Sequence, residues 1–179
     1  MLKRKVTGVD IQLLKGDISK QDDIEAIVNA TNAQLRTGGG VAGAIHRTAG
    51  PGLEKECRPL APIKPGEAVI TSGHNLPNGY VIHCLGPVYG VDKPEDKLLR
   101  DCYVNSLNLA EENKVKSIAF PAISTGAFGY PIDKAVKIAL ETVLDKLSEL
   151  KNLKTIRFVL YSQNDLNIYE KTLNEMIKW

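Results

Sequence analysis

The chain has 179 residues, of which 43% are hydrophobic and 25% are charged, and its formal net charge is +2. This size and composition predict a single domain over residues 1–179, and the small charge argues against a protein that holds nucleic acid through its overall charge. No apolar run approaches the roughly 20 residues that span a bilayer, and no signal-peptide core follows the basic N-terminus. A cytoplasmic location is therefore expected.

Cys57, Cys84 and Cys102 are an odd number of cysteines without C-x-x-C spacing. This pattern argues against a disulfide framework and against a zinc ribbon. Buried packing is the expected role, and a catalytic cysteine is the open alternative.

Strands and helices are predicted to alternate along the chain, from the period and turn signals of the sequence. In chain order they are a strand over 9–14, a strand over 24–30, short helices over 41–49 and 53–60, strands over 67–72 and 80–85, a helix over 94–110, a strand over 117–121, a helix over 131–150, a strand over 155–161 and a helix to residue 177, capped by Asn164 or Asp165. This alternation predicts an α/β domain of three layers.

Two glycine-rich loops follow predicted strands. The first glycine loop (residues 29–40) contains Gly38-Gly-Gly40 and feeds a helix, and the second glycine loop (residues 122–129) reads Ala-Ile-Ser-Thr-Gly-Ala-Phe-Gly. Bare backbone N–H groups in such loops bind anions, because glycine lets the backbone approach closely. Loops at the carboxyl ends of strands meet at one edge of an α/β sheet. The two loops and Asp17 are therefore expected to converge, with the loops closing on a diphosphate.

Other nucleotide and hydrolase motifs do not fit. Gly38 to Gly43 matches G-x-G-x-x-G, but seven residues (31–37) separate it from the strand, and the ribose-binding acidic residue of a dinucleotide fold is missing. The sequence contains no P-loop and no G-x-S-x-G elbow.

Several side chains near these loops have two readings. Asp17 either accepts from an adenine amino group or caps the turn that begins near Ser19. Asn32 offers an acceptor and two donors, which suits a ribose diol, and Phe128 is either a wall against a sugar or base, or part of the core. Asn29 is expected to stabilise the loop through its amide. His46 and His83 are expected to have structural roles, His46 as a helix residue packed under the loop and His83 as a strand residue in the sheet.

Five stretches in register make the sequence similar to the macrodomain family: Gly16-Asp-Ile18, Val28-Asn-Ala-Thr-Asn32, Gly38 to Pro51, Ile82-His-Cys-Leu-Gly-Pro87 and Phe120 to Pro131. The resemblance covers essentially the whole chain. It implies a mixed central sheet with helices on both faces and a cleft that binds ADP-ribose.

The resemblance also assigns roles by position. Asp17 and Ile18 would hold the adenine, with a platform near Asn164 for which Tyr161 is a substitute aromatic residue. Asn32, Gly40 and Phe128 would be the catalytic positions at the terminal ribose. The diphosphate and terminal ribose would lie against Gly38, Gly39, Gly40, Val41, Ser124, Thr125, Gly126, Ala127 and Phe128.

One position departs from the family's hydrolytic MacroD-type subgroup, which has an aspartate where this chain has Ala42. That aspartate is linked to activating or positioning a water, so a general base is missing here. Other macrodomains are similar to this chain in reading Val-Ala-Gly and are still linked to removing ADP-ribose from acidic side chains. The resemblance to them implies an ester hydrolase acting on mono-ADP-ribosylated Asp or Glu side chains or on O-acetyl-ADP-ribose. The alternative, which Ala42 favours, is a non-catalytic reader of ADP-ribose. Phosphatase action on ADP-ribose 1″-phosphate is a distant third. A monomer without cofactor, metal, membrane or specific nucleic-acid partner is expected, with ADP-ribosylated proteins as candidate partners.

Overall fold

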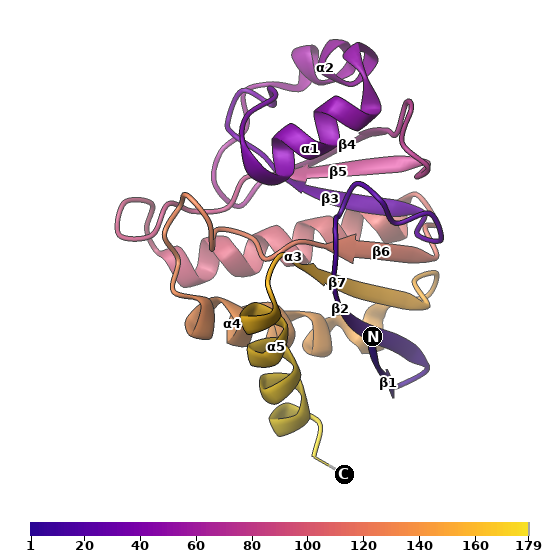
Figure 1. Cartoon of the computed structure of the whole chain (residues 1–179), viewed down its shortest axis with the longest axis vertical. Helices are drawn as coiled ribbons and strands as arrows, with labels where there is room; N and C mark the ends of the chain where they lie inside the picture. Colours follow the sequence, from indigo (N-terminus) through magenta and orange to yellow (C-terminus); the bar gives the residue numbers. More distant parts are fainter. Residues whose placement is uncertain (179) are drawn as a thin grey trace.

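The computed structural model describes residues 1–178 and contains one seven-stranded sheet with helices on both faces (Figure 1). The strands are β1 (Leu2–Val6), β2 (Val9–Lys15), β3 (Ala26–Ala30), β4 (Ala68–Ser72), β5 (Tyr80–Cys84), β6 (Ser117–Phe120) and β7 (Thr155–Leu160). The helices are α1 (Gly40–Ala49), α2 (Pro51–Cys57), α3 (Glu95–Glu112), α4 (Ile132–Lys146) and α5 (Gln163–Met176), with short 3₁₀ turns η1 (Arg58–Leu60) and η2 (Leu147–Glu149).

The strand order is β1-β2-β7-β6-β3-β5-β4. The five inner strands are parallel to their neighbours, while β1 and β4 pair antiparallel at the two edges. The expected mixed sheet is confirmed. Because the inner strands run in one direction, the loops that follow them leave the sheet at the same edge.

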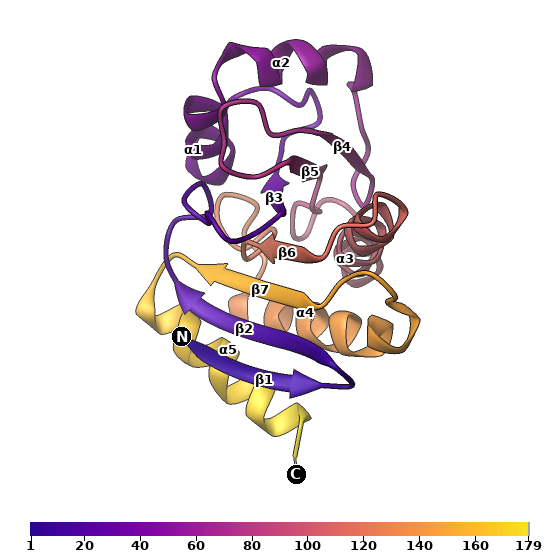
Figure 2. The same cartoon turned by 90° about the vertical axis from the view of Figure 1, so that its right-hand side faces the viewer.

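Two apolar clusters fill the space between the sheet and its helices. The larger cluster lies under α3, α4 and α5, and the smaller one lies under α1 and α2. Figure 2 shows the two groups of helices on either side of the sheet, with α1 and α2 far from β1. The three-layer α/β/α sandwich predicted from the sequence is confirmed.

Strand β1 was not expected from the sequence. Leu2–Val6 alternates between half-buried and exposed residues and pairs with β2 through the two-residue turn Thr7-Gly8. Both turn residues have positive φ, at 46° and 82°. This backbone conformation matches the twist of a hairpin. Such turns usually have Asn or Asp at the first position, so Thr7-Gly8 does not show the usual sequence signal of a hairpin.

The predicted cap of the last helix was wrong. Helix α5 is capped by Ser162, whose Oγ accepts from the Asp165 N–H at 3.1 Å. Serine satisfies an unpaired donor of the first turn in this way. Asn164 is therefore an exposed residue of the first turn and not the cap.

Arg157 of β7 anchors the segment between β2 and β3. Its buried guanidinium donates to the side chains of Gln12, Gln21 and Asp23 at 2.7 to 2.9 Å. Gln21 in turn donates to the Asp17 carbonyl at 2.8 Å. The loop that carries Asp17 is thereby fixed to the centre of the sheet.

Replacement of Asp23 by Asn should lower the free energy of unfolding at neutral pH by about 1 kcal/mol, because the Asp23 carboxylate pairs with buried Arg157 but is 69% exposed itself. The hydrogen bond from Arg157 lowers the pKa of Asp23. The contribution is therefore complete above the ordinary carboxyl pKa and disappears as the pH falls through the lowered value. Denaturant titrations from neutral pH to about pH 2.5 would measure it. The neighbouring exposed variant Asp22→Asn is the control, and an equal loss in both variants would contradict the assignment.

Candidate functional site

The predicted ligand residues meet at the carboxyl edge of the sheet. Asp17 follows β2, Asn32 follows β3, and the second glycine loop follows β6. Tyr161 directly follows β7, which pairs with β2 so that Leu160 lies opposite Lys15. Strands β3 and β6 are neighbours, so the two glycine loops begin side by side.

Asn32 shapes the first glycine loop. Its Nδ2 donates to the Arg36 carbonyl at 2.9 Å, and its Oδ1 accepts from the Arg36 N–H at 3.1 Å. A Cβ on Gly38 would come within 3.6 Å of the same Nδ2. The half-buried amide of Asn32 therefore lies next to the glycines, with one N–H not used by Arg36.

The glycines of this loop open directly into α1. Gly39 is the cap residue and offers no side chain, and the first turn contains no acidic residue. The first helical hydrogen bond is donated by the Gly43 N–H to Gly39 at 3.2 Å, so the N–H groups of residues 40–42 lack helical acceptors. Gly40 has φ of +55°, and a Cβ on Gly39 or Gly40 would meet no atom within 4 Å. The start of α1 is an uncapped, positively polarised helix end beside open space.

The second glycine loop presents a similar set of donors. Its turn is closed by hydrogen bonds from Gly129 to Gly126 and from Tyr130 to Ser124. Within residues 1–178, the N–H groups of residues 124–128 have no acceptor. Gly126 is exposed, and a Cβ there would meet no atom within 4 Å.

Gly86, which follows β5, packs against Ser124 of this loop. A Cβ on Gly86 would come within 2.1 Å of the Ser124 Oγ, so only glycine allows this approach. Ser124 is held at φ of +66°, and its hydroxyl is buried. The Thr125 hydroxyl donates to the Ala122 carbonyl at 2.9 Å. The assignment of Ser124 to the diphosphate and terminal ribose stays a prediction. Within residues 1–178, the donors of this loop that lack a partner include the N–H groups of residues 124–128 and the Ser124 hydroxyl.

Apolar side chains from both sides of the edge share one cluster. Ile18 is 5% exposed within the smaller cluster, and Val41 and Phe128 pack against it while remaining half-buried. The core reading of Phe128 is therefore confirmed in part, because the side chain packs on the cluster and keeps an exposed part. The wall against a sugar or base stays a prediction. Ile18 has too little exposed side chain to form a wall, but its N–H has no acceptor among residues 1–178.

Asp17 closes the turn at the end of β2. Its Oδ1 accepts from the N–H and the hydroxyl of Ser19 at 2.9 and 2.6 Å, and these bonds lower the pKa of the carboxyl group. The turn-capping reading is correct for this oxygen. Oδ2 has no such partner within the described residues, so the exposed carboxylate keeps an acceptor. Tyr161 lies beside this turn and is 91% exposed.

The two sequence-selected histidines and Asn29 are structural. His83 is fully buried between Asn29, whose Nδ2 lies 3.1 Å from Nδ1, and Thr71, whose hydroxyl lies 3.0 Å from Nε2. Burial lowers the pKa of His83 to about 3, which keeps the ring neutral. Burial also lowers the pKa of His46, which is 7% exposed. The partner of Asn29 is a side chain of β5 and not the loop backbone.

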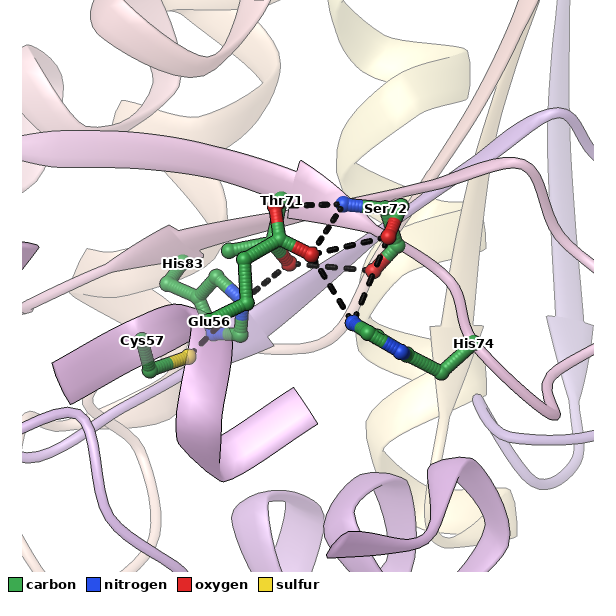
Figure 3. A network of polar contacts seen from close by, with 6 residues as sticks. All are labelled: Glu56, Cys57, Thr71, Ser72, His74 and His83. Carbon is green, nitrogen blue, oxygen red and sulfur yellow. Dashed lines mark hydrogen bonds and ion pairs between the residues drawn. The ribbon is translucent and has the colours of Figure 1, made fainter. Parts of the chain in front are cut away.

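Figure 3 shows His83 in a polar network that attaches α2 to β4. Cys57 Sγ lies 3.7 Å from His83 Nε2, and burial raises the pKa of this thiol to about 11. Glu56 accepts from the Ser72 hydroxyl and contacts His74 Nε2, both at 2.8 Å. The raised pKa of Cys57 favours the protonated thiol, which is the less reactive form. All three cysteines are buried and unpaired, as the packing role predicts.

Among residues 1–178, no group of three or more His, Cys, Asp or Glu side chains is arranged to hold a metal ion. Nor does any helix in that range have the length and apolar character needed to cross a membrane. Ala42, the departure noted in the sequence, lies in the first turn of α1 and is 6% exposed.

Comparison with known proteins identifies the family. The Macro domain family model matches residues 28–139. A macro domain-containing protein of Chlorobaculum tepidum is 47% identical over 93% of this chain and 96% of its own length. The human ADP-ribose glycohydrolase MACROD2 is 44% identical over 92% of this chain, which spans only 39% of that protein. The solved macrodomain of Oceanobacillus iheyensis with ADP has a TM-score of 0.94 and 39% identity, covering 99% of this chain and 96% of that one. The chain therefore belongs to the macro domain family.

Proposed function

We propose that this protein binds ADP-ribose at the carboxyl edge of the sheet and hydrolyses esters at the terminal ribose. The proposal rests on two sets of backbone N–H groups that have no acceptor within residues 1–178. One set is residues 40–42 at the start of α1, and the other is residues 124–128 in the second glycine loop. A diphosphate between them would receive several charge-assisted hydrogen bonds from backbone that needs no reorganisation. The ADP of the Oceanobacillus relative and the activity named for MACROD2 support the same ligand class.

The other contacts follow from the positions of the side chains. Asp17 Oδ2 and the Ile18 N–H would hold the adenine edge, and Asn32 would place the terminal ribose beside the half-buried Phe128. The substrates proposed are mono-ADP-ribosylated Asp or Glu side chains and O-acetyl-ADP-ribose. For a protein ester, water would attack the anomeric carbon, the bond from that carbon to the carboxylate oxygen would break, and the second proton of the water would pass to the leaving carboxylate or to solvent. For O-acetyl-ADP-ribose, water would instead attack the acetyl carbonyl carbon, and the ribose hydroxyl would leave with that proton. A backbone group and a diphosphate oxygen would hold that water, because Ala42 supplies no base.

Two measurements test this function. Calorimetric titration with ADP-ribose should give a dissociation constant in the micromolar range, which corresponds to a binding free energy on the order of −8 kcal/mol. Incubation with a Glu-linked mono-ADP-ribosylated protein should release ADP-ribose above the rate without enzyme. Binding without release would leave the second candidate, a non-catalytic reader, which the missing carboxylate at Ala42 favours.

Tyr161→Ala should weaken ADP-ribose binding about tenfold, because the exposed ring beside the Asp17 turn would stack on the adenine. AMP should lose affinity by a similar factor. Tyr161→Phe, which keeps the ring, is the matched control and should bind like the wild type. Fluorescence or calorimetric titration of the three proteins would decide this, and unchanged AMP affinity in Tyr161→Ala would place the adenine elsewhere.

A further inference from the structure

A second polar surface adjoins the first glycine loop. It consists of two pockets that share Glu54 of α2. The smaller pocket, of about 110 Å³, is also lined by Arg36 and by Arg58 of η1, and it contains Leu35 and Ala61 in its wall. The larger and more open pocket, of about 270 Å³, is lined by Arg47 of α1. Neither pocket includes a residue to which we assign contact with ADP-ribose.

Within the part of the chain that the structure describes, the arginines of this surface lack ion-pair partners. Of the six arginines in the sequence, Arg100 and Arg157 form ion pairs with carboxylates. Across residues 1–178, no carboxylate oxygen lies within 4.0 Å of a side-chain nitrogen of the three arginines that line the pockets. Three exposed guanidinium groups thus surround a single carboxylate, Glu54. The surface is locally positive in a chain whose total charge is only +2.

This surface is connected to the proposed ribose position through one residue. Both backbone groups of Arg36 are hydrogen-bonded to the Asn32 amide, at 2.9 and 3.1 Å. The side chain of Arg36 then lines the smaller pocket. A protein attached to the terminal ribose near Asn32 would therefore have its neighbouring residues close to Arg36.

We propose that the pocket between Arg36 and Arg58 binds an acidic side chain of the ADP-ribosylated protein, close in sequence to the modified residue. This inference rests on the proposed function and specifies its substrate class as acidic segments. The guanidinium forks match a carboxylate, and the half-buried Ala61 in the pocket wall offers an apolar surface to its methylene groups. Glu54 between the arginines disfavours a continuous polyanion such as nucleic acid, because its charge would repel successive phosphates.

The test uses two peptides that carry ADP-ribose through a hydrolysis-resistant linkage. One has Glu and Asp on both sides of the modified position, and the other has Gln and Asn. The wild-type protein should bind the acidic peptide about five- to tenfold more tightly at low salt, and the preference should shrink at high salt. Arg58→Glu should abolish the preference and leave the affinity for free ADP-ribose unchanged.

Arg4→Glu is the matched control, since Arg4 is in β1 at the opposite edge of the sheet and has no carboxylate partner in the described residues. It should keep the preference. Equal affinity of the wild type for both peptides, with ADP-ribose binding intact, would overturn the acidic pocket alone. Failure of free ADP-ribose and of both peptides to bind would overturn the proposed function as well.

Discussion

Gly126→Glu should weaken ADP-ribose binding at least about 100-fold without unfolding the protein. A Cβ at Gly126 meets no atom within 4 Å, and this glycine has no positive φ, so a larger side chain fits the backbone. It would extend into the space beside the unpaired N–H groups of the second glycine loop. A carboxylate there would repel the diphosphate and compete for donors that are worth about 1.5 to 3 kcal/mol each with a charged acceptor.

Gly126→Gln separates charge from size in this experiment. It should lose less affinity than Gly126→Glu, and both variants should melt within about 2 °C of the wild type, as expected for exposed positions. Calorimetric titration and thermal melts measure the two effects. Wild-type affinity in Gly126→Glu would show that the diphosphate does not lie against this loop.

Ala42→Asp should raise turnover of a Glu-linked ADP-ribosyl substrate about 100-fold, the lower end of the contribution of a positioned general base. Ala42 is in the first turn of α1, where the helix dipole and the N–H groups stabilise a carboxylate, and the turn has no acidic residue of its own. The affinity for ADP-ribose should fall at the same time, because the new carboxylate competes with the diphosphate for these N–H groups.

Ala42→Asn introduces a side chain of nearly the same shape as the Asp of Ala42→Asp but without a base. Its turnover rate should therefore stay near that of the wild type. Single-turnover release of ADP-ribose by the three proteins would compare them. If Asp and Asn gave equal rates, the side chain at this position would not activate water. If only Ala42→Asp showed release above background, the natural chain would be the reader and not the hydrolase.

The fold was largely predictable because its inner strands and helices have clear hydrophobic periods. The strands that are buried on both faces read as apolar runs, and α4 shows one apolar stripe. Strand β1 was missed because its exposed positions are Lys3 and Lys5 on an edge strand, where charges are common and the apolar signal is weak. The cap at Ser162 had a signal, since Ser162-x-x-Asp165 fits a capping box, but the sequence offered several cap-forming residues in succession.

The site was predictable as a set of loops but not as a set of contacts. Parallel topology follows from the alternation of elements, and it brings Asp17 and both glycine loops to one edge. Local hydrogen bonds do not follow from the sequence. The Asn32 amide holding Arg36, and the burial of the Ser124 hydroxyl against Gly86, depend on backbone dihedrals that no pattern specifies. The anchoring of the Asp17 loop by Arg157 had no sequence signal, because the two segments are far apart in the chain.

The proposed function depends on the two glycine loops binding the diphosphate of ADP-ribose together. A crystal structure with ADP-ribose tests it most directly, because it locates both phosphates and any water at the anomeric carbon. Phosphate oxygens should lie within hydrogen-bonding distance of N–H groups in residues 40–42 and in residues 124–128. A diphosphate bound away from either set would contradict it.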